Sequence, residues 1–158
     1  MFVSASDSPS SAFTRQTRPT VARRTLPRIK GPTATHLASG RCLPIVADIA
    51  ATGTAVIGVS GLEDLRELKA AAAGRVSLLG NLNGVAMRRW TARDAETAVK
   101  RAIAGAARGG GFVLADNHGE IPWQVPDEVL LAIREAVDRW GRYPLDWVDG
   151  WRDEADAP

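Results

Sequence analysis

The segment Phe112-Val-Leu-Ala-Asp-Asn-His-Gly-Glu-Ile-Pro122 decides the fold of this chain. It begins as an apolar run typical of a buried strand, turns polar at Asp116, Asn117 and His118, and is ended by a glycine and a proline. Polar residues directly after a buried strand are how a barrel of alternating strands and helices builds part of an active site. The segment therefore predicts part of an enzyme with a parallel α/β fold.

Two earlier apolar runs end in the same way. His36 follows the run that begins at Thr33, and Asn81 and Asn83 follow the run 76–80. Three polar strand ends favour a binding role over isolated loop residues. Local alternatives remain open: His36 as a satisfied core residue, Asn81 and Asn83 as turn residues, and Asp116 as a cap of the following loop.

From residue 33 onward, short apolar runs alternate with stretches of helical period, which predicts four strand-helix units. Because the strands are apolar on both faces and each precedes a helix, we expect them to be parallel and covered, as in a barrel or a doubly wound sheet. No glycine-rich phosphate loop follows the first strand. The expected strands are 33–38, 55–60, 75–80 and 111–115, and the expected helices lie within 44–52, 62–74, 91–106 and 126–140.

The helical periods also predict which side chains are buried. Thr91 and Asp94 form an approximate capping box at the start of the third helix. The expected buried stripes are Leu62, Leu65, Leu68 and Ala72; Ala95, Val99, Ala102, Ile103 and Ala106; and Leu130, Ile133, Val137 and Trp140. For the loop aromatics Trp90 and Trp123, packing against helices is favoured over bordering a pocket.

Composition allows one domain with an apolar core, since 45% of the 158 residues are hydrophobic. The single cysteine, Cys42, excludes an internal disulfide, and neither a membrane-spanning run nor a signal peptide is present. We therefore expect a cytoplasmic protein without membrane contact.

Charge is uneven along the chain. Residues 1–32 hold six basic residues and one aspartate, a net charge of +5, so the remainder carries −3 of the total +2. This composition predicts a disordered basic leader, with a transit peptide or a junction foreign to the fold as alternatives. A binding module that uses this arm on nucleic acid is a further alternative, although nucleic acid is not the expected partner. The acidic tail 142–158 is expected to lay its tryptophans over the last helix.

Several motifs in a fixed order resemble the C-terminal half of the uroporphyrinogen decarboxylase (URO-D) superfamily. They are Gly80-Asn-Leu-Asn83, Gly110-Gly-Phe-Val-Leu114, His118-Gly119 and the helix 125–137. The resemblance spans 33–141 and implies the last four units of a TIM barrel. Because a complete barrel needs about 250 residues, we expect a truncated or split form, with a homodimer or a second chain completing the barrel.

The resemblance implies two branches, decarboxylases that need no cofactor and corrinoid-linked methyltransferases that bind zinc. His36 matches the first residue of the methyltransferase His-x-Cys motif, but Ala38 stands in place of the cysteine, and His118 falls near the last cysteine of the family. The chain thus lacks a thiolate-rich zinc site. No cofactor is expected, with zinc on His36 and His118 as the alternative.

The decarboxylase branch implies a histidine that holds a substrate carboxylate in a Gly-His-Gly element. His118-Gly119 matches it, although Asn117 replaces the first glycine, and Asn83-Gly84 replaces the Asp-Pro of the family. The arginine-rich motif and the catalytic aspartate of the family belong to the N-terminal half, so no catalytic residue is assigned. The expected ligand is a tetrapyrrole or a methyl donor, and the expected substrate-binding residues are His118, Asn81, Asn83, Asp116 and Asn117.

Overall fold

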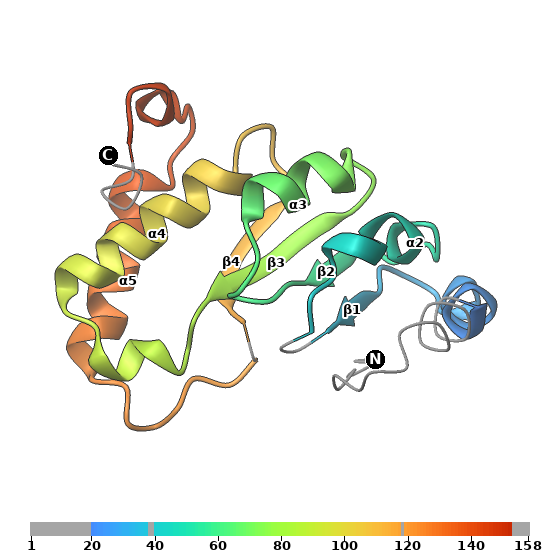
Figure 1. The fold of residues 1–158 in the computed structure, drawn as a ribbon, viewed down its shortest axis with the longest axis horizontal. Coiled ribbons are helices and arrows are strands. Elements are labelled where there is room, and N and C mark those ends of the chain that lie inside the picture. Colours follow the sequence, from blue (N-terminus) through green and yellow to red (C-terminus); the bar gives the residue numbers. More distant parts are fainter. Residues whose placement is uncertain (1–19, 38–39, 118, 153–158) are drawn as a thin grey trace.

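The computed structural model describes residues 20–37, 40–117 and 119–152. In this part of the chain four strands form one parallel sheet in the order β1-β2-β3-β4, and a helix follows each strand (Figure 1). The prediction of four parallel strand-helix units is confirmed, and the sequential strand order is the one found within a TIM barrel. The strands are β1 (Ala34–His36), β2 (Val56–Gly58), β3 (Ser77–Leu82) and β4 (Phe112–Asp116).

The helices lie along one side of the strands (Figure 1). The α-helices are α2 (Val46–Ala50), α3 (Leu65–Ala72), α4 (Ala92–Ala106) and α5 (Asp127–Trp140), and short 3-10 turns are η1 (Leu26–Arg28), η2 (Leu43–Ile45), η3 (Ala86–Arg89) and η4 (Asp146–Asp149). None of the helices in the described ranges is long and apolar enough to cross a membrane.

The two faces of the sheet differ in how well they are covered. Residues paired across neighbouring parallel strands point to the same face. Ile57 pairs with Leu78, and both are fully buried in the core that the helices cover. On the other face Leu79 pairs with Val113, whose side chain is 50% exposed. The sheet is therefore closed by helices on one face and partly open on the other.

Strand β3 extends two residues further than the sequence predicted. It runs to Leu82 rather than Gly80, because its pairing with β4 continues through Asn81 opposite Ala115 and Leu82 opposite Asp116. A polar side chain can occupy this strand because it points to the face that is only partly covered. Asn81 is thus a strand residue instead of a loop residue.

The helix that follows β3 was predicted correctly. All five side chains of its expected stripe are buried, and Thr91 caps α4 with a complete capping box. The Thr91 hydroxyl accepts from the Asp94 backbone N–H at 3.2 Å, while the Asp94 carboxylate accepts from the Thr91 backbone N–H at 2.7 Å. Two of the amides that every helix start leaves without a partner are satisfied in this way.

Thr91→Ala is expected to lower the free energy of unfolding by about 1 kcal/mol, because α4 loses its cap. The hydrogen bond from the Thr91 backbone lowers the pKa of Asp94. Because the pKa of Asp94 is lower in the folded protein, this carboxyl adds stability at pH values above its ordinary pKa of about 3.9. That added stability is lost as the pH falls below this value. Urea unfolding should show Thr91→Ser close to the wild type, and equal losses for serine and alanine would contradict the cap.

Two of the predicted stripes need correction. Leu62 is 64% exposed, because α3 begins only at Leu65 and Leu62 lies in the preceding loop. In α5 the prediction is half right: Ile133 and Trp140 pack against the core, whereas Leu130 and Val137 are exposed and Val129 and Ala136 are the buried positions. The period alone left two apolar stripes in competition, and the one that includes Val129 and Ala136 is buried.

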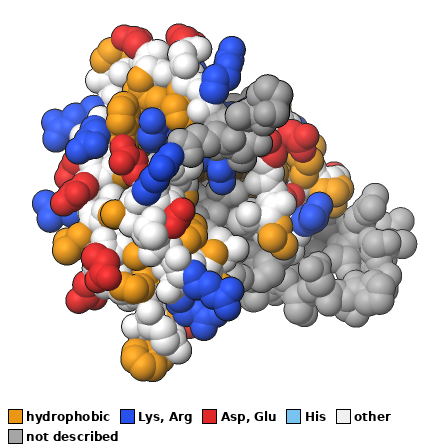
Figure 2. All heavy atoms as spheres, turned by 60° about the vertical axis from the view of Figure 1, so that its left-hand side comes forward, with side chains coloured by type: hydrophobic (Ala, Val, Ile, Leu, Met, Phe, Trp, Pro, Cys, Tyr) orange, Lys and Arg blue, Asp and Glu red, His pale blue; other side chains and the backbone are white. Residues whose placement is uncertain are grey.

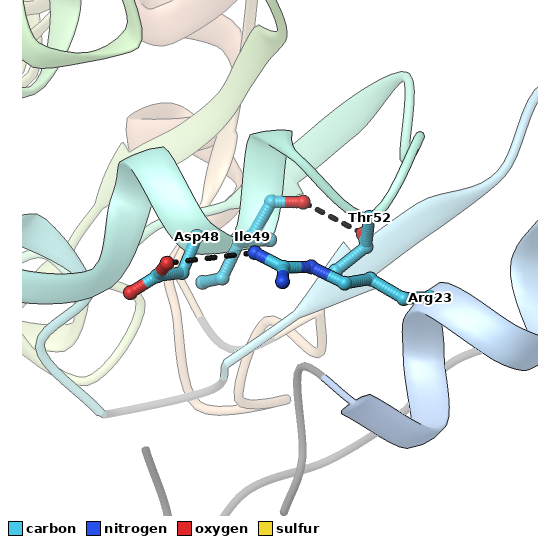
Figure 3. Close-up of polar contacts among 4 residues, drawn as sticks. All are labelled: Arg23, Asp48, Ile49 and Thr52. Atoms are coloured by element: carbon cyan, nitrogen blue, oxygen red, sulfur yellow. Dashed lines mark hydrogen bonds and ion pairs between the residues drawn. The ribbon is translucent and has the colours of Figure 1, made fainter. Parts of the chain in front are cut away.

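Part of the predicted leader is helical. Residues 20–25 form a helix that continues into η1, and Leu26 is buried. Arg23 Nη2 lies 3.6 Å from Asp48 Oδ1 of α2 in an exposed ion pair (Figure 3). The expectation of disorder through residue 32 therefore does not hold for residues 20–28, and residues 1–19 lie outside the described ranges.

The acidic tail packs on the last two helices. The rings of Trp140 and Trp147 meet edge to face with centroids 5.3 Å apart, and Trp151 continues the cluster at 6.0 Å from Trp147. The ammonium of Lys100 in α4 lies 4.3 Å from the Trp140 ring centroid, a cation–π contact. The tail thus lies over the last helices as far as Arg152, and residues 153–158 lie outside the described part.

Candidate functional site

The polar strand ends meet at the carboxyl edge of the sheet. A Cβ added at Gly61, in the loop after β2, would lie 3.0 Å from the Asn81 backbone oxygen and 3.3 Å from Asn117 Nδ2. Asn117 directly follows β4, and its backbone N–H donates to the Leu82 carbonyl of β3 at 2.8 Å. The loops after β2, β3 and β4 therefore approach one another closely, as the barrel prediction required.

Two of the three asparagines, Asn81 and Asn117, join two segments, and Asn83 makes a local bond within its own loop. Asn81 Nδ2 donates to the backbone carbonyls of Ser60 at 3.1 Å and Glu63 at 3.0 Å, and so ties β3 to the loop after β2. Asn83 Oδ1 accepts from the Ala86 backbone N–H at 3.0 Å at the start of η3, which is the role of a turn residue. The turn interpretation is therefore confirmed for Asn83 and wrong for Asn81, which is a strand residue.

Asn117 is the most deeply placed of the three. Its side chain is only 4% exposed, and its Oδ1 accepts from the Gly84 backbone N–H at 3.2 Å. A buried amide needs hydrogen-bond partners, and the bond to Gly84 supplies one of them. The substitution of a family glycine by Asn117 thus adds a bond between the loops after β3 and β4.

Asp116 caps its own loop. Its Oδ2 accepts from the Gly119 backbone N–H at 2.7 Å, which matches the capping alternative. The same oxygen would lie 3.7 Å from a Cβ at Gly84, so the carboxylate stands beside the loop after β3. His118, which the sequence makes the best site residue, lies outside the described residues.

His36 lies at the end of β1, opposite Gly58 in the register of the sheet. Its imidazole covers that glycine closely, because a Cβ at Gly58 would lie 2.3 Å from His36 Cδ2. The ring is half-buried against the sheet. Strand β2 therefore needs a residue without a side chain at position 58 to accept the histidine.

Glu63 is a site residue that sequence reasoning missed. Its Oε1 accepts from the backbone N–H groups of Cys42 at 2.8 Å and Leu43 at 2.7 Å, so one carboxylate joins the loops after β1 and β2. Its Oε2 is buried without a hydrogen-bond partner among the described residues. In the sequence Glu63 falls inside the helix predicted to begin at Leu62, and no local pattern marks its carboxylate as the partner of residues 42 and 43.

The thiol beside this carboxylate is held in its neutral form. Burial is the largest cause that raises the pKa of Cys42 well above its ordinary value, followed by the negative charge of Glu63 and a hydrogen bond to its side chain. Cys42 is fully buried and forms no disulfide. A neutral buried thiol is a poor nucleophile, which assigns Cys42 to the core rather than to the chemistry.

The native protein should therefore react at least about a hundredfold more slowly with a thiol reagent at pH 8 than the unfolded chain, the factor expected for about 2.7 kcal/mol of opening free energy. Because the folded pKa of Cys42 is raised, the stability that this adds is complete below the ordinary thiol pKa of 9.0 and is lost as the pH rises above it. Equal labelling rates in native and urea-unfolded protein would contradict the buried thiol.

Two hollows lie at this edge of the sheet. The larger has a volume of about 590 Å³ and is lined by Asn83, Asn117, Arg88 and Arg89 among others. The smaller, about 280 Å³, is lined by Glu63 and Asn81, and it shares Asn83 and Trp90 with the larger one. The larger volume lies within the range of small-molecule sites.

The structure thus brings most of the predicted residues together. Asn83 and Asn117 line one cavity, Asn81 lines its neighbour, and Asp116 stands beside Gly84, whereas His36 lies two strands away from β3. The favoured interpretation as packed aromatics is confirmed in part for Trp90 and is wrong for Trp123. Trp90 packs against the core and also lines both cavities, while Trp123 is 89% exposed.

The described residues do not fit the zinc alternative. They contain no group of three histidine, cysteine, aspartate or glutamate side chains that could hold a metal ion. A catalytic zinc needs at least three protein ligands.

The fold and the polar carboxyl edge together define the class of this protein, half of a TIM barrel with a polar cavity at the loops that follow the strands. The model of the family "Uroporphyrinogen decarboxylase (URO-D)" matches residues 9–140. The chain belongs to the uroporphyrinogen decarboxylase family. The match includes residues 9–32, which composition alone assigned to the leader.

A solved structure with the same fold is a methyltransferase from Methanosarcina mazei. It is 22% identical, with a TM-score of 0.72, and the alignment covers 89% of this chain and 42% of that chain. The chain described here therefore spans less than half the length of that protein. A comparison with curated protein sequences gives no match.

Proposed function

We propose that this chain supplies the C-terminal half of a decarboxylase of the uroporphyrinogen type, which removes carboxylate groups from a tetrapyrrole without a cofactor. The observation that carries the proposal is the cavity at the carboxyl edge, where Asn83 and Asn117 stand beside two arginines and no described lining residue is acidic. Membership in the family supports the reaction class. The free buried thiol of Cys42 is compatible with a reducing cytoplasm.

The work of the described residues is binding and positioning. A substrate with several carboxylates must be held by cationic and amide groups, and charged hydrogen bonds are the strongest available. Asn83 and Asn117 face the cavity from two successive loops, while Asn81 fixes the loop after β2. By resemblance, His118 holds a substrate carboxylate. The group that protonates the pyrrole ring is assigned to the other half of the barrel.

Completion of the barrel by a second polypeptide half, or by a second copy of this chain, is part of the proposal. In the described part of the chain, β1 and β4 each have only one neighbouring strand. Unpaired strand edges invite pairing with another chain, and a closed barrel removes them. The half-exposed Val113 on the less covered face is the kind of apolar surface that such a partner would bury.

The test is co-expression of the full chain with the N-terminal barrel half of an intact URO-D family member. Loss of carboxylates from anaerobic uroporphyrinogen III would then be followed by chromatography. We expect product from the pair, none from either half, and about a tenfold lower rate with Asn117→Ala. Arg134→Ala on the outer surface of α5 is the control. A soluble, associated pair without product would refute the proposal.

The methyltransferase branch is the second candidate, because the neighbouring structure carries that name. It requires a bound metal, for which His36 supplies one donor in the described part of the chain. Metal analysis of protein purified in the presence of zinc separates the two. One zinc per chain that is lost in His36→Ala would support the methyltransferase branch, and a value near zero would count against it.

A further inference from the structure

The larger cavity has two adjacent arginines in its wall. Arg88 and Arg89 end η3, the short turn directly after β3, and both line the cavity of about 590 Å³. In Figure 1 η3 and the loop between β4 and α5 lie together at the lower end of the molecule. In Figure 2, which is turned about the vertical axis of Figure 1, Lys and Arg side chains gather near the bottom of the visible face, beside protruding hydrophobic side chains.

These two guanidinium groups differ from those of arginines that form ion pairs with a carboxylate, such as Arg23, Arg108, Arg134 and Arg139. Within the described ranges neither has a carboxylate oxygen within 4.0 Å, whereas Arg108 meets Asp149 at 2.6 Å. Arg88 Nε donates to the Val85 carbonyl at 3.2 Å, which orients the side chain without neutralising it. Two positive charges at neighbouring positions repel each other, and an anion between them would remove that cost.

The rest of the cavity wall suits an anion. Asn83, Asn117 and Ser60 contribute amide and hydroxyl groups, and the described lining residues include no aspartate or glutamate. Guanidinium groups bind carboxylates through two parallel hydrogen bonds, and neighbouring amides add further donors. The chemistry of this wall selects negatively charged oxygen atoms.

The rim of the same cavity is apolar. Leu62 from the loop after β2 and Val85 from the loop after β3 are 64% and 48% exposed, and Trp90 completes this side. Exposed large apolar side chains beside a cationic pocket mark a binding surface. A small inorganic anion would use the arginines and leave these three side chains in water. The rim therefore favours a ligand with an apolar body.

We infer that Arg88 and Arg89 form a subsite for a carboxylate of an amphiphilic ligand, whose apolar body contacts Leu62, Val85 and Trp90. This inference rests on the proposed function, because it makes the subsite the place where one edge of the substrate is anchored. Arg88 and Arg89 are thereby added to the binding residues of the proposed site. Arg88 and Arg89 act in binding and in the choice between acidic and neutral ligands.

The experiment is isothermal titration of the full chain with benzene-1,2,4-tricarboxylate, its trimethyl ester and inorganic phosphate. We expect the tricarboxylate to bind at least about tenfold more tightly than the ester or phosphate. Arg88→Ala and Arg89→Ala should each weaken it by about tenfold, Leu62→Ala by a few-fold, and lysine at either arginine position should restore part of the loss. The control variant Arg134→Ala should bind as the wild type does.

Three results would overturn the inference. They are absence of tricarboxylate binding, equal affinity in the Arg88→Ala/Arg89→Ala double variant, and equal affinity for phosphate, which would make the pocket a general anion site. This titration needs no turnover. If the assembled barrel decarboxylates its substrate and the arginine variants leave binding unchanged, only the subsite fails. If binding depends on the arginines and no product forms, only the proposed reaction fails.

Discussion

Replacing Glu63 by alanine is expected to lower the free energy of unfolding by about 2–4 kcal/mol, more than any cap in the fold contributes. Its Oε1 is the acceptor for two backbone N–H groups, those of Cys42 and Leu43. Without the carboxylate both donors lose their charged partner, and a buried donor without a partner costs about 1–3 kcal/mol. The loops after β1 and β2 would then separate and expose Cys42.

Urea unfolding together with the rate of Cys42 labelling measures this effect. Glu63→Gln keeps an oxygen acceptor and should lose about half as much stability as the alanine variant, since the bonds become neutral. Glu67→Ala, on the exposed side of α3, is the matched control and should change the free energy by less than about 0.5 kcal/mol. If Glu63→Ala and Glu67→Ala were equally stable, the proposed tie between the loops would be wrong.

The same contact illustrates why the sequence did not reveal the whole site. The periodic elements were predictable, because α4 has a cap at Thr91 and a buried stripe that repeats every three or four residues. Glu63 has no such pattern. Its partners are backbone groups twenty residues earlier in the chain, and only the folded structure brings them within hydrogen-bond distance.

The sequence predicted which segments form strands, but it did not predict the residue at which β3 ends. The apolar run before Asn81 predicted β3, but the pairing with β4 carries the strand to Leu82. Strand length depends on the neighbouring strand, which the local sequence does not contain. For a related reason the sequence did not predict that Arg88 and Arg89, at the end of η3, would belong to the site. Two exposed basic residues in a loop are ordinary until a fold places them on a cavity wall with Asn117.

The partly wrong prediction of the buried stripe on α5 has a third physical cause. Leu130, Leu131 and Val137 are all apolar and all exposed, so hydrophobicity did not distinguish the packed face from the others. The packed face contains Val129 and Ala136, which are the buried positions of α5. Single exposed apolar side chains are common on the surfaces of folded proteins.

The close fit of His36 over Gly58 leads to the second large effect. Gly58→Ala places a methyl group 2.3 Å from His36 Cδ2, far inside van der Waals contact, so the imidazole must leave its place. Forcing an extra methyl group into packed structure costs about 1–3 kcal/mol. The backbone of Gly58 does not have a positive φ, so the cost arises from the histidine ring rather than from the glycine conformation.

A double-mutant cycle tests this explanation directly. His36→Ala removes the ring, and Gly58→Ala in that background should cost less than about 0.5 kcal/mol, so that the two substitutions couple by at least about 1 kcal/mol. Gly53→Ala would be a poor control because φ at Gly53 is +84°. Ala substitution at Gly150, where nothing lies within 4 Å of an added Cβ, is the better one. Additive costs at positions 36 and 58 would mean that the added methyl group clashes with the sheet itself and not with the imidazole of His36.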